Sequence, residues 1–465
     1  MKPPQAVKTA CLLCAALLQA VNIGAQSVTK IAAGDDHSLF LKSDGSLWAM
    51  GYNDGQTMGV GSGQLGDGTY NNTNRPELIV SGNVTAVAGG FFHSLFVKSD
   101  GSLWAMGWEM DGQLGDGTMG SFPYYSTNRP VQIVASNVTA VAGGFYHSLF
   151  LKNDGSLWAM GGNEFGQLGD GTYNQANQPE QIVASNVTAI AAGQDHSLFL
   201  KSDGSLWAMG GNSEGELGDG TYNNTNQPEE IVASNVVAIA AENLHSLFLK
   251  NDGSLWAMGD NVSGQLGDGS TNNTDQPEQI VASNVIAIAA GGYHSVLLES
   301  GGSLWTMGDN VLGELGDGTY NNTNRPEKIV AGGVTAVAAG GSHTLFVKND
   351  GSMWAMGANG EGQLGDGVHY SIFTPFDRWG TNRPEQIVVN PAYNQISSQL
   401  LRDGAMQLSF VGIAGTNYAL DYSFSLSPAN WLPLLTNTAG VGGVLVFTNT
   451  PDATANNFWR IRSLP

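Results

Sequence analysis

Seven histidines, each followed by a serine or threonine, are the first residues in this sequence that could do chemistry. They are His37, His93, His147, His196, His245, His294 and His343. Histidine beside serine suggests nucleophilic hydrolysis, but that chemistry needs a nucleophile and a base that meet in space with an orienting acid, and such constellations are single and asymmetric. Sevenfold repetition favours a structural role. We expect each histidine to hydrogen-bond a backbone group and to fix the turn before it.

Seven aspartates form a second repeated set, each within a Leu-Gly-Asp-Gly motif. They are Asp67, Asp116, Asp170, Asp219, Asp268, Asp317 and Asp366. An aspartate between glycines is ordinary turn chemistry. A calcium site needs several oxygens that converge on one point, and the spacing here does not match a calcium-binding loop. The sequence therefore predicts no metal site and no cofactor.

The spacing of these residues shows a tandem repeat. A tryptophan follows each histidine after eleven residues, and four of the six intervals between histidines are 49 residues long, the first two being 56 and 54. A fixed period of this length indicates one supersecondary unit copied in tandem. In the fourth copy we expect four antiparallel strands, A to D, at 179–183, 187–192, 196–201 and 205–209. Ser-Asn joins A to B, and Asp-Gly, a strong hairpin signal, joins C to D.

Seven such sheets can bury their faces if they stack radially as the blades of a β-propeller. The fold class predicted is all-β, with a propeller over residues 26–390 in which the tryptophan of strand D packs between blades. The repeats begin at strand B, residues 28–31, and end at strand A, residues 384–388. We expect residues 384–388 to pair with the first blade and to close the ring, because pairing removes an exposed sheet edge.

Residues 143–171 carry the fullest copy of the repeat, with Gly143-Gly144, His147-Ser148-Leu149, Asp154-Gly155, Trp158 and the run from Gly161 to Gly171. This pattern resembles the regulator of chromosome condensation repeat. The resemblance covers about residues 28–390 and implies a seven-bladed propeller. It does not imply one function: the founding member is a nucleotide-exchange factor for a small nuclear GTPase, whereas the exported bacterial members include propellers that inhibit β-lactamases through a loop-rich face.

The amino-terminal segment predicts export. Lys2 and Lys8 precede an apolar run, and residues 1–25 are interpreted as a signal peptide, which places the protein outside the cell, in the periplasm or at the surface of a Gram-negative bacterium. The two cysteines, Cys11 and Cys14, lie in this segment, and no later stretch is apolar enough to span a membrane. The formal net charge of −22 argues against nucleic-acid binding, which relies on lysine and arginine.

Residues 391–465 form a different kind of sequence. Apolar residues alternate here with polar ones, as in Met406-Leu408-Phe410 and Val444-Val446. Such alternation predicts a separate β-rich module of five or six strands. Attachment, sorting and glycan contact remain open as its role.

Alternating strand directions sort the connections by face. The B–C turns and the long D–A linkers should lie on one face, the top, and the constant Ser-Asn and Asp-Gly turns on the other. The top-face loops vary, and binding usually resides in variable loops on a rigid frame. Their large aromatic residues are typical of protein interfaces, and they could also stack on sugars or simply pack on each other. The predicted partner-binding residues are Phe91, Phe92, Trp108, Phe122, Tyr124, Tyr125, Phe145, Tyr146, Phe376 and Trp379.

These observations predict a non-enzymatic exported scaffold that binds an unidentified protein partner through the top face. One alternative is a guanine-nucleotide exchange factor, which the resemblance allows and the acidic charge disfavours. A second is a hydrolase or lyase acting on a polysaccharide. It would need an unrepeated acid–base cluster at the mouth of the ring, for which the candidates are Asp35, Asp36, Glu109 and His369.

Overall fold

The structure is a computed structural model that describes residues 26–54, 61–120, 126–368 and 380–387, and in the tail residues 396–400, 406–411, 417–423, 432–438, 444–449 and 458–463. The chain divides into two units, of which Ser27–Val388 is one. The predicted signal peptide, residues 1–25, lies outside the described residues. Within the described residues no helix is long and apolar enough to cross a membrane.

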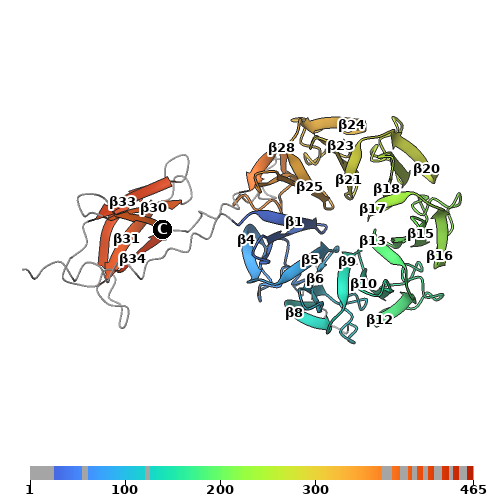
Figure 1. The fold of residues 1–465 in the computed structure, drawn as a ribbon, viewed down its shortest axis with the longest axis horizontal. Coiled ribbons are helices and arrows are strands. Elements are labelled where there is room, and N and C mark those ends of the chain that lie inside the picture. Colours follow the sequence, from blue (N-terminus) through green and yellow to red (C-terminus); the bar gives the residue numbers. More distant parts are fainter. Residues whose placement is uncertain are drawn as a thin grey trace, which may run out of the picture. The chain divides into compact units, whose positions relative to one another are not determined.

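Seven four-stranded antiparallel sheets stand around a central axis (Figure 1), so the predicted seven-bladed propeller is confirmed. The first four blades contain β1 (Val28–Ala33), β2 (His37–Lys42), β3 (Leu47–Gly51) and β4 (Thr73–Val80); β5 (Val84–Gly89), β6 (His93–Lys98), β7 (Leu103–Trp108) and β8 (Ser126–Val134); β9 (Val138–Gly143), β10 (His147–Lys152), β11 (Leu157–Gly161) and β12 (Ala176–Val183); and β13 (Val187–Ala192), β14 (His196–Lys201), β15 (Leu206–Gly210) and β16 (Thr225–Val232). The last three contain β17 (Val236–Glu242), β18 (His245–Lys250), β19 (Leu255–Gly259) and β20 (Thr274–Val281); β21 (Val285–Ala290), β22 (His294–Glu299), β23 (Leu304–Gly308) and β24 (Thr323–Val330); and β25 (Val334–Ala339), β26 (His343–Lys348), β27 (Met353–Ala358) and β28 (Gly380–Ile387).

The order of strands within a blade corrects one prediction. Each strand A pairs with the strand D before it, as Trp158 of β11 pairs with Gln181 of β12, and it does not pair with the strand B that follows. Residues 384–387 accordingly lie in β28 against β27, where Glu385 is opposite Ala355, and the predicted pairing of 384–388 with 28–34 is wrong. The Ser-Asn turn is not a hairpin, because it passes from the outer strand of one blade to the inner strand of the next.

The physical reason lies in where the backbone groups of that turn are satisfied. Val187, just after the turn, donates its N–H to the carbonyl of Gly155 in the C–D turn of the preceding blade, at 3.0 Å. Val28 donates in the same way to Gly351, at 3.2 Å, across the junction between the last blade and the first. The same contact joins the other six pairs of neighbouring blades, so the junction between the last blade and the first is closed in the same way. Because strand directions still alternate, the B–C turns and D–A linkers share the top face as predicted.

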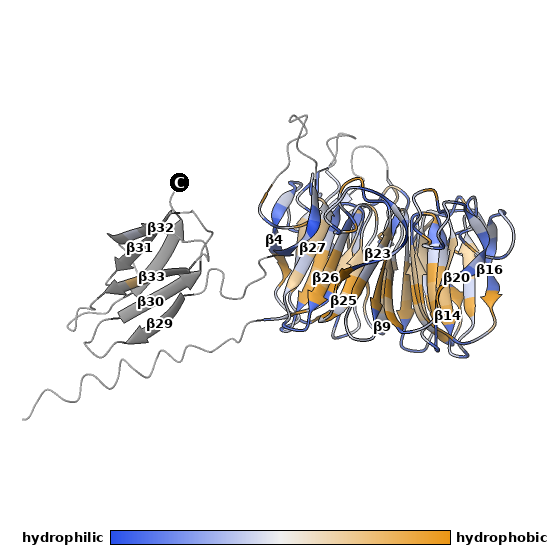
Figure 2. Ribbon diagram, turned by 90° about the horizontal axis from the view of Figure 1, so that it is seen from above, coloured by the Kyte–Doolittle hydropathy of each residue, from blue (hydrophilic) through white to orange (hydrophobic). Residues whose placement is uncertain are grey.

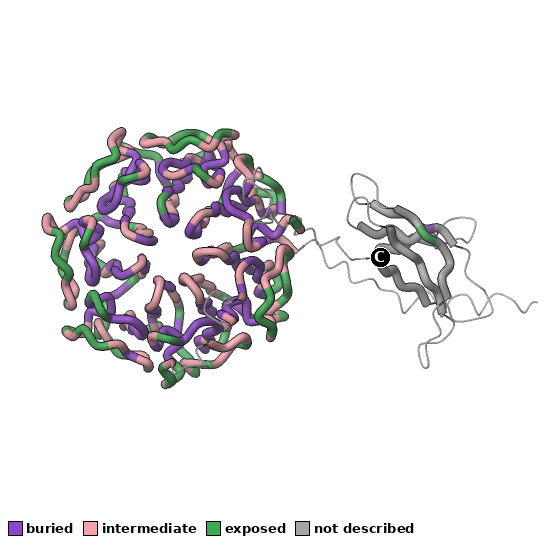
Figure 3. The backbone as a smooth tube through the Cα atoms, turned by 180° about the vertical axis from the view of Figure 1, so that it is seen from behind, coloured by how far each residue is buried: buried purple, intermediate pink, exposed green. Residues whose placement is uncertain are grey.

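The hydrophobic core lies between blades rather than within one. Leu39 and Leu47 of blade 1 pack with Phe96 and Met106 of blade 2, and the partly buried Trp104 covers this cluster, as predicted for strand D. Figure 2 shows the apolar residues in the middle of the strands, and Figure 3 shows that burial is greatest in the two middle strands of each blade and lower in its innermost and outermost strands. Each blade therefore supplies one half of two cores, and no blade can bury its own apolar faces alone.

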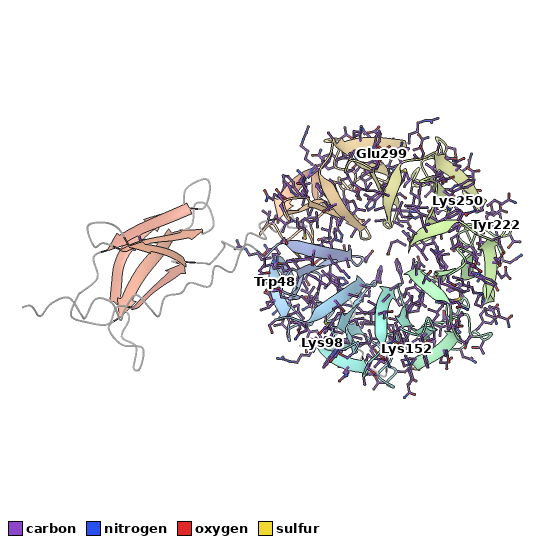
Figure 4. The ribbon with its side chains drawn as sticks, in the orientation of Figure 1. Trp48, Lys98, Lys152, Tyr222, Lys250 and Glu299 are labelled. Atoms are coloured by element: carbon purple, nitrogen blue, oxygen red, sulfur yellow. The ribbon has the colours of Figure 1, made fainter. Side chains whose placement is uncertain are left out.

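A lysine covers the outer face of most of the repeated tryptophans. In six blades the last residue of strand C, such as Lys98, Lys152 or Lys250 (Figure 4), lies 3.5 to 4.0 Å above the ring of the strand D tryptophan. Blade 6 has Glu299 at this position, and there Lys328 from the neighbouring strand lies 4.6 Å above Trp305. A cation thus caps each of these half-buried rings, and the Lys–Trp pairs belong to the frame of the propeller.

The described residues of the tail form six strands in two three-stranded antiparallel sheets. One sheet has the order β29 (Ile396–Leu400), β30 (Met406–Val411), β33 (Val444–Asn449); the other has β32 (Leu432–Thr438), β31 (Asn417–Ser423), β34 (Phe458–Ser463). The expected small β module is present.

Candidate functional site

The seven histidines form a closed ring of side-chain hydrogen bonds. Each Nε2 lies 2.8 or 2.9 Å from the hydroxyl oxygen of the serine or threonine that follows the histidine of the next blade, and His343 reaches Ser38 across the closing junction. The expected structural role is correct, but the expected backbone partner is wrong. Sequence reasoning missed this partner, although the invariant hydroxyl beside each histidine was the signal for it.

The direction of these bonds follows from the second contact of each hydroxyl. Ser197 also lies 2.8 Å from the carbonyl oxygen of Gln167, and the six equivalent hydroxyls make the same contact at 2.7 to 3.0 Å. A carbonyl can only accept, so the hydroxyl donates to it and the histidine Nε2–H donates to the hydroxyl. Burial lowers the pKa of His147 to about 3, and that of His93 to about 4. These neutral, enclosed rings hold the blades together and are not placed to act on a substrate.

The seven repeated aspartates stabilise turns. Asp170 accepts hydrogen bonds from the backbone N–H of Thr172 at 2.8 Å and from the amide of Asn163 at 3.1 Å. The same Asn–Asp bond recurs in six blades at 3.0 to 3.2 Å. Within the described part of the chain, no group of three or more histidine, cysteine, aspartate or glutamate side chains is arranged to hold a metal ion.

The candidate acid–base residues do not form a single cluster. Asp36 accepts a hydrogen bond from Gln363 at 2.9 Å, and burial raises its pKa to about 6; burial also raises the pKa of Asp35. Glu109 occupies the position that asparagine has in the other six blades and accepts the same bond from the N–H of Leu114, at 3.0 Å. His369 lies outside the described residues.

Glu109 makes the turn of blade 2 weaker than its counterparts, which gives a first prediction. Its Oε1 is buried without a partner, and burial raises its pKa to about 9. We expect Glu109→Asn to restore the missing bond to Asp116 and to stabilise the propeller by about 1 kcal/mol at pH 5. Because the pKa of Glu109 is raised in the folded state, the native protein loses stability as pH rises from 4.5 to 9. The stability advantage of Glu109→Asn should therefore grow over this pH range.

Thermal unfolding of both proteins at pH 5, 7 and 8.5 checks this prediction. Asn163→Asp in blade 3, which removes the corresponding amide donor, is the matched control and should destabilise. An advantage of Glu109→Asn that is independent of pH would show that Glu109 is ionised in the folded protein.

An aromatic cluster covers the top face over blades 1 to 3. Its members are Tyr52, Phe91, Phe92, Trp108, Phe145 and Tyr146. Phe91 lies 4.2 Å from Phe92 and 4.4 Å from Phe145 between ring centroids, and so joins the tips of neighbouring blades. Phe92 also contacts Tyr52 at 5.7 Å and Trp108 at 6.2 Å. Sequence reasoning did not include Tyr52, although it occupies the position in blade 1 that Trp108 has in blade 2.

The structure therefore brings five of the ten predicted site residues together: Phe91, Phe92, Trp108, Phe145 and Tyr146. Four of these are partly exposed, while Trp108 is only 6% exposed and supports the others. Phe122, Tyr124, Tyr125, Phe376 and Trp379 lie outside the described residues.

Beside the cluster, over blades 2 to 4, lies a pocket of about 350 Å³, the aromatic–acidic pocket. Its lining is aromatic and acidic, with a few amides, and consists of Phe92, Trp108, Met110, Asp111, Tyr146, Gly162, Glu164, Phe165, Gln167, Gln175, Gln194 and Asp195. None of these lining residues is basic. Three carboxyl groups thus share a partly apolar hollow without a cation among its walls.

The electrostatics of this pocket reflect that arrangement. Burial, and then the charges of Glu164 and Asp111, raise the pKa of Asp195 to about 6, while its bond from Gln194 at 3.0 Å opposes the shift. Burial and the charge of Glu164 likewise raise the pKa of Asp111, which accepts a bond from Gln175 at 2.8 Å. The pKa of the Tyr146 hydroxyl is raised by burial and by both of these aspartates. The pocket therefore has a negative potential that nothing in its lining neutralises.

A larger hollow of about 760 Å³ lies at the outer edge between blades 6 and 7. Lys328, Lys348 and Arg383 mix there with Asp317 and Glu327, so its walls have no single sign of charge. It is lined by strands β24, β26 and β28 and by part of the repeated Leu-Gly-Asp-Gly turn rather than by variable loops. The top-face cluster and its pocket combine loop variation, exposed rings and one sign of charge, and they are the better candidate site.

Comparison with known proteins adds to this geometry. The family model of the RCC1-like domain matches residues 15–282 and 185–400. A segment of 144 residues is 29% identical to the ultraviolet-B receptor UVR8 of Arabidopsis thaliana, covering 30% of this chain and 31% of the receptor. A segment of 148 residues is 34% identical to a protein RCC2 homolog of Xenopus laevis, covering 30% of this chain and 27% of that protein. The matches thus span about a third or less of these relatives.

Solved propellers share the fold. Yeast RCC1 (Prp20), crystallised with Kap60, has a TM-score of 0.64 at 21% identity, with 80% of this chain and 86% of that one covered. Human WBSCR16 has a TM-score of 0.59 at 24% identity, with coverages of 68% and 85%. At these identities the likeness shows the fold alone.

Proposed function

We propose that this chain, which belongs to the family of proteins with an RCC1-like domain, is a non-enzymatic binding scaffold that engages a protein partner through the top face of its propeller. The observation that carries the proposal is the aromatic cluster, whose partly exposed rings lie on variable loop tips above a rigid ring. Aromatic residues grouped in this way are typical anchors of protein interfaces.

The frame beneath the cluster supports a scaffold role. The Nε2 atoms of the seven histidines and the turn aspartates are hydrogen-bonded to other residues of the propeller. The repeated residues are thus used for structure, and the differences between blades concentrate on the top face. Among the solved structures, that of Prp20p of Saccharomyces cerevisiae accompanies its binding properties to Gsp1p and histones, and yeast RCC1 (Prp20) was crystallised bound to Kap60. Propellers of this fold thus engage proteins. As part of the same proposal, the protein acts after export.

The proposal is tested with Phe92→Ala combined with Tyr146→Ala. We expect the double variant to fold, with a loss of stability of about 2 kcal/mol or less from the missing ring contacts, and to lose most of its partner binding. The measurement is capture of a partner from culture medium with the propeller as bait, followed by the affinity of the purified pair.

Tyr293→Ala is the matched control, because Tyr293 occupies the position of Phe92 on the blade 6 tip and is 41% exposed. Unfolding of the double variant would favour the alternative that the rings only pack the loops. Full retention of binding by the folded double variant would place the interface elsewhere.

A further inference from the structure

We propose that the aromatic–acidic pocket receives the side chain of an arginine presented by the protein partner. This inference rests on the proposed function and adds the chemistry of the contact. It follows from the shape, the walls and the charge of the pocket, each of which selects for a flat cation.

The walls offer aromatic surface to an entering group. Phe92 and Trp108 lie 6.2 Å apart between ring centroids on the side of blade 2, Tyr146 lies on blade 3, and Phe165, which is 39% exposed, lines the pocket from the blade 3 linker. A cation over the face of an aromatic ring is attracted by the electron density of the ring. These rings would hold a cation more firmly than a neutral group of the same shape.

The carboxyl groups are held in place by amides. Gln175 donates to Asp111 at 2.8 Å, while Gln194 and Gln167 donate to the two oxygens of Asp195 at 3.0 and 3.3 Å. Glu164 is exposed at the rim. Each carboxylate can accept more than one hydrogen bond, so all three retain capacity for a ligand that donates. The amides orient the acids without supplying the missing positive charge.

A guanidinium group meets both requirements at once. It is planar, stacks on aromatic faces, remains charged at physiological pH and donates several hydrogen bonds in one plane to carboxylates. The apolar part of an arginine side chain would also cover Met110, which is 51% exposed beside the pocket.

The set of residues that lines the pocket is not repeated in every blade. The positions that hold Glu164 and Asp195 hold Val262 and Tyr293 in the copies of blades 5 and 6. Blades 5 and 6 therefore lack the counterparts of Glu164 and Asp195, and the arginine contact we propose would favour the side of the ring over blades 2 to 4.

The experiment compares two blocked tripeptides, Gly-Arg-Gly and Gly-citrulline-Gly, which have nearly the same shape and differ in charge. Saturation-transfer NMR and calorimetric titration of the full chain at low salt measure their binding. We expect the arginine peptide to bind at least tenfold more tightly than the citrulline peptide. We also expect Glu164→Gln combined with Asp195→Asn, and separately Phe165→Ala, to weaken arginine binding several-fold.

Asp309→Asn is the matched control, since it removes a partly buried top-face carboxylate in blade 6, outside the pocket, and should leave binding unchanged. Glu164 and Phe165 are exposed, so single changes there test the inference even if the double variant is unstable. Equal binding of the two peptides, or an equal loss with Asp309→Asn, would overturn the inference.

The outcome is separable from that of the proposed function. Capture of a partner that depends on Phe92 and Tyr146 but not on Glu164 and Asp195 would leave the scaffold role standing and remove the arginine contact. Pocket-dependent binding of the arginine peptide without any captured protein would support the arginine site and argue against the proposed scaffold role.

Discussion

Gly144→Ala is expected to destabilise the propeller by about 3 kcal/mol, an effect at the upper end of overpacking in a core. A Cβ atom at Gly144 would lie 2.3 Å from Cε1 of His147 and 2.5 Å from the carbonyl oxygen of Gly193 in the next blade. The carbonyl is backbone and cannot rotate away. The added methyl would therefore separate two blades at the point where His147 donates to Ser197.

Blade 5 shows how the ring tolerates a larger residue at this position. Glu242 replaces the glycine there, and strand β17 continues to pair Glu242 with His245, while Asn243 adopts a φ of 44°. Asparagine enters this left-handed region more readily than most residues. Blade 3 has Phe145 at the position of Asn243, and phenylalanine does not adopt the left-handed conformation as readily.

Denaturant unfolding of Gly144→Ala and of Gly360→Ala checks this result. Gly360 is the control, since nothing lies within 4 Å of the Cβ position there and its backbone conformation suits other residues. The control should change stability by less than about 0.5 kcal/mol. Equal effects at the two sites would show that the close approach of blades at Gly144 is not essential.

Acidification is expected to leave stability nearly unchanged from pH 6 to about 4.5 and to lower the melting temperature by roughly 15 °C in the next pH unit. The seven ring histidines have folded pKa values of about 3 or 4, well below the ordinary value of 6.5. Below pH 6.5 the unfolded chain binds protons that the folded ring does not, so this term destabilises as pH falls. Each unmatched proton costs about 1.4 kcal/mol per pH unit.

Buried carboxyl groups offset this loss of stability over a limited range of pH. Burial raises the folded pKa of Asp36 and Asp195 to about 6, that of Glu216 and Glu314 to about 7 and that of Glu109 to about 9. Burial also raises the pKa of Asp35 and Glu242, so that these seven carboxyl groups oppose the seven histidines. A raised folded pKa means that these groups stabilise the folded state as pH falls toward their ordinary values near 4. Below that pH the unfolded chain is protonated as well, and the histidine term is no longer offset.

Thermal unfolding followed by circular dichroism from pH 7 to pH 3 measures this balance, and the slope of stability against pH gives the proton difference directly. A steady decline that begins at pH 6.5 would contradict the prediction, because it would mean that the buried carboxyl groups are ionised in the folded propeller.

The sequence predicted the repeat, the blade number and the orientation of the loops because each depends on local signals, such as the Asp-Gly turns and the period of the histidines. It did not predict where strand A pairs. A strand can use either edge, and the structure pairs β12 with β11 while Val187 bonds to Gly155 of the preceding blade. The partner of His147 was missed for the same reason, because Ser197 lies 50 residues away and in another blade.

The candidate site was predictable in part. The contact between Phe91 and Phe145 follows from their positions on adjacent tips. The aromatic–acidic pocket does not, because Asp111, Glu164 and Asp195 come from three blades and each is unremarkable in its own repeat. Sequence comparison within the chain identifies what varies, and only the fold shows which varying residues meet.

The histidine ring has a direction, because each blade donates to its successor and His343 donates to Ser38 as any other blade does to the next. Among the strands that the structure describes, none pairs across the junction between the last blade and the first. All seven seams thus share this hydrogen bond, and the peptide backbone could be opened at any of them without changing which side chains form it. The wheel is defined by rotational symmetry rather than by chain connectivity, which makes it a natural host for circular permutation.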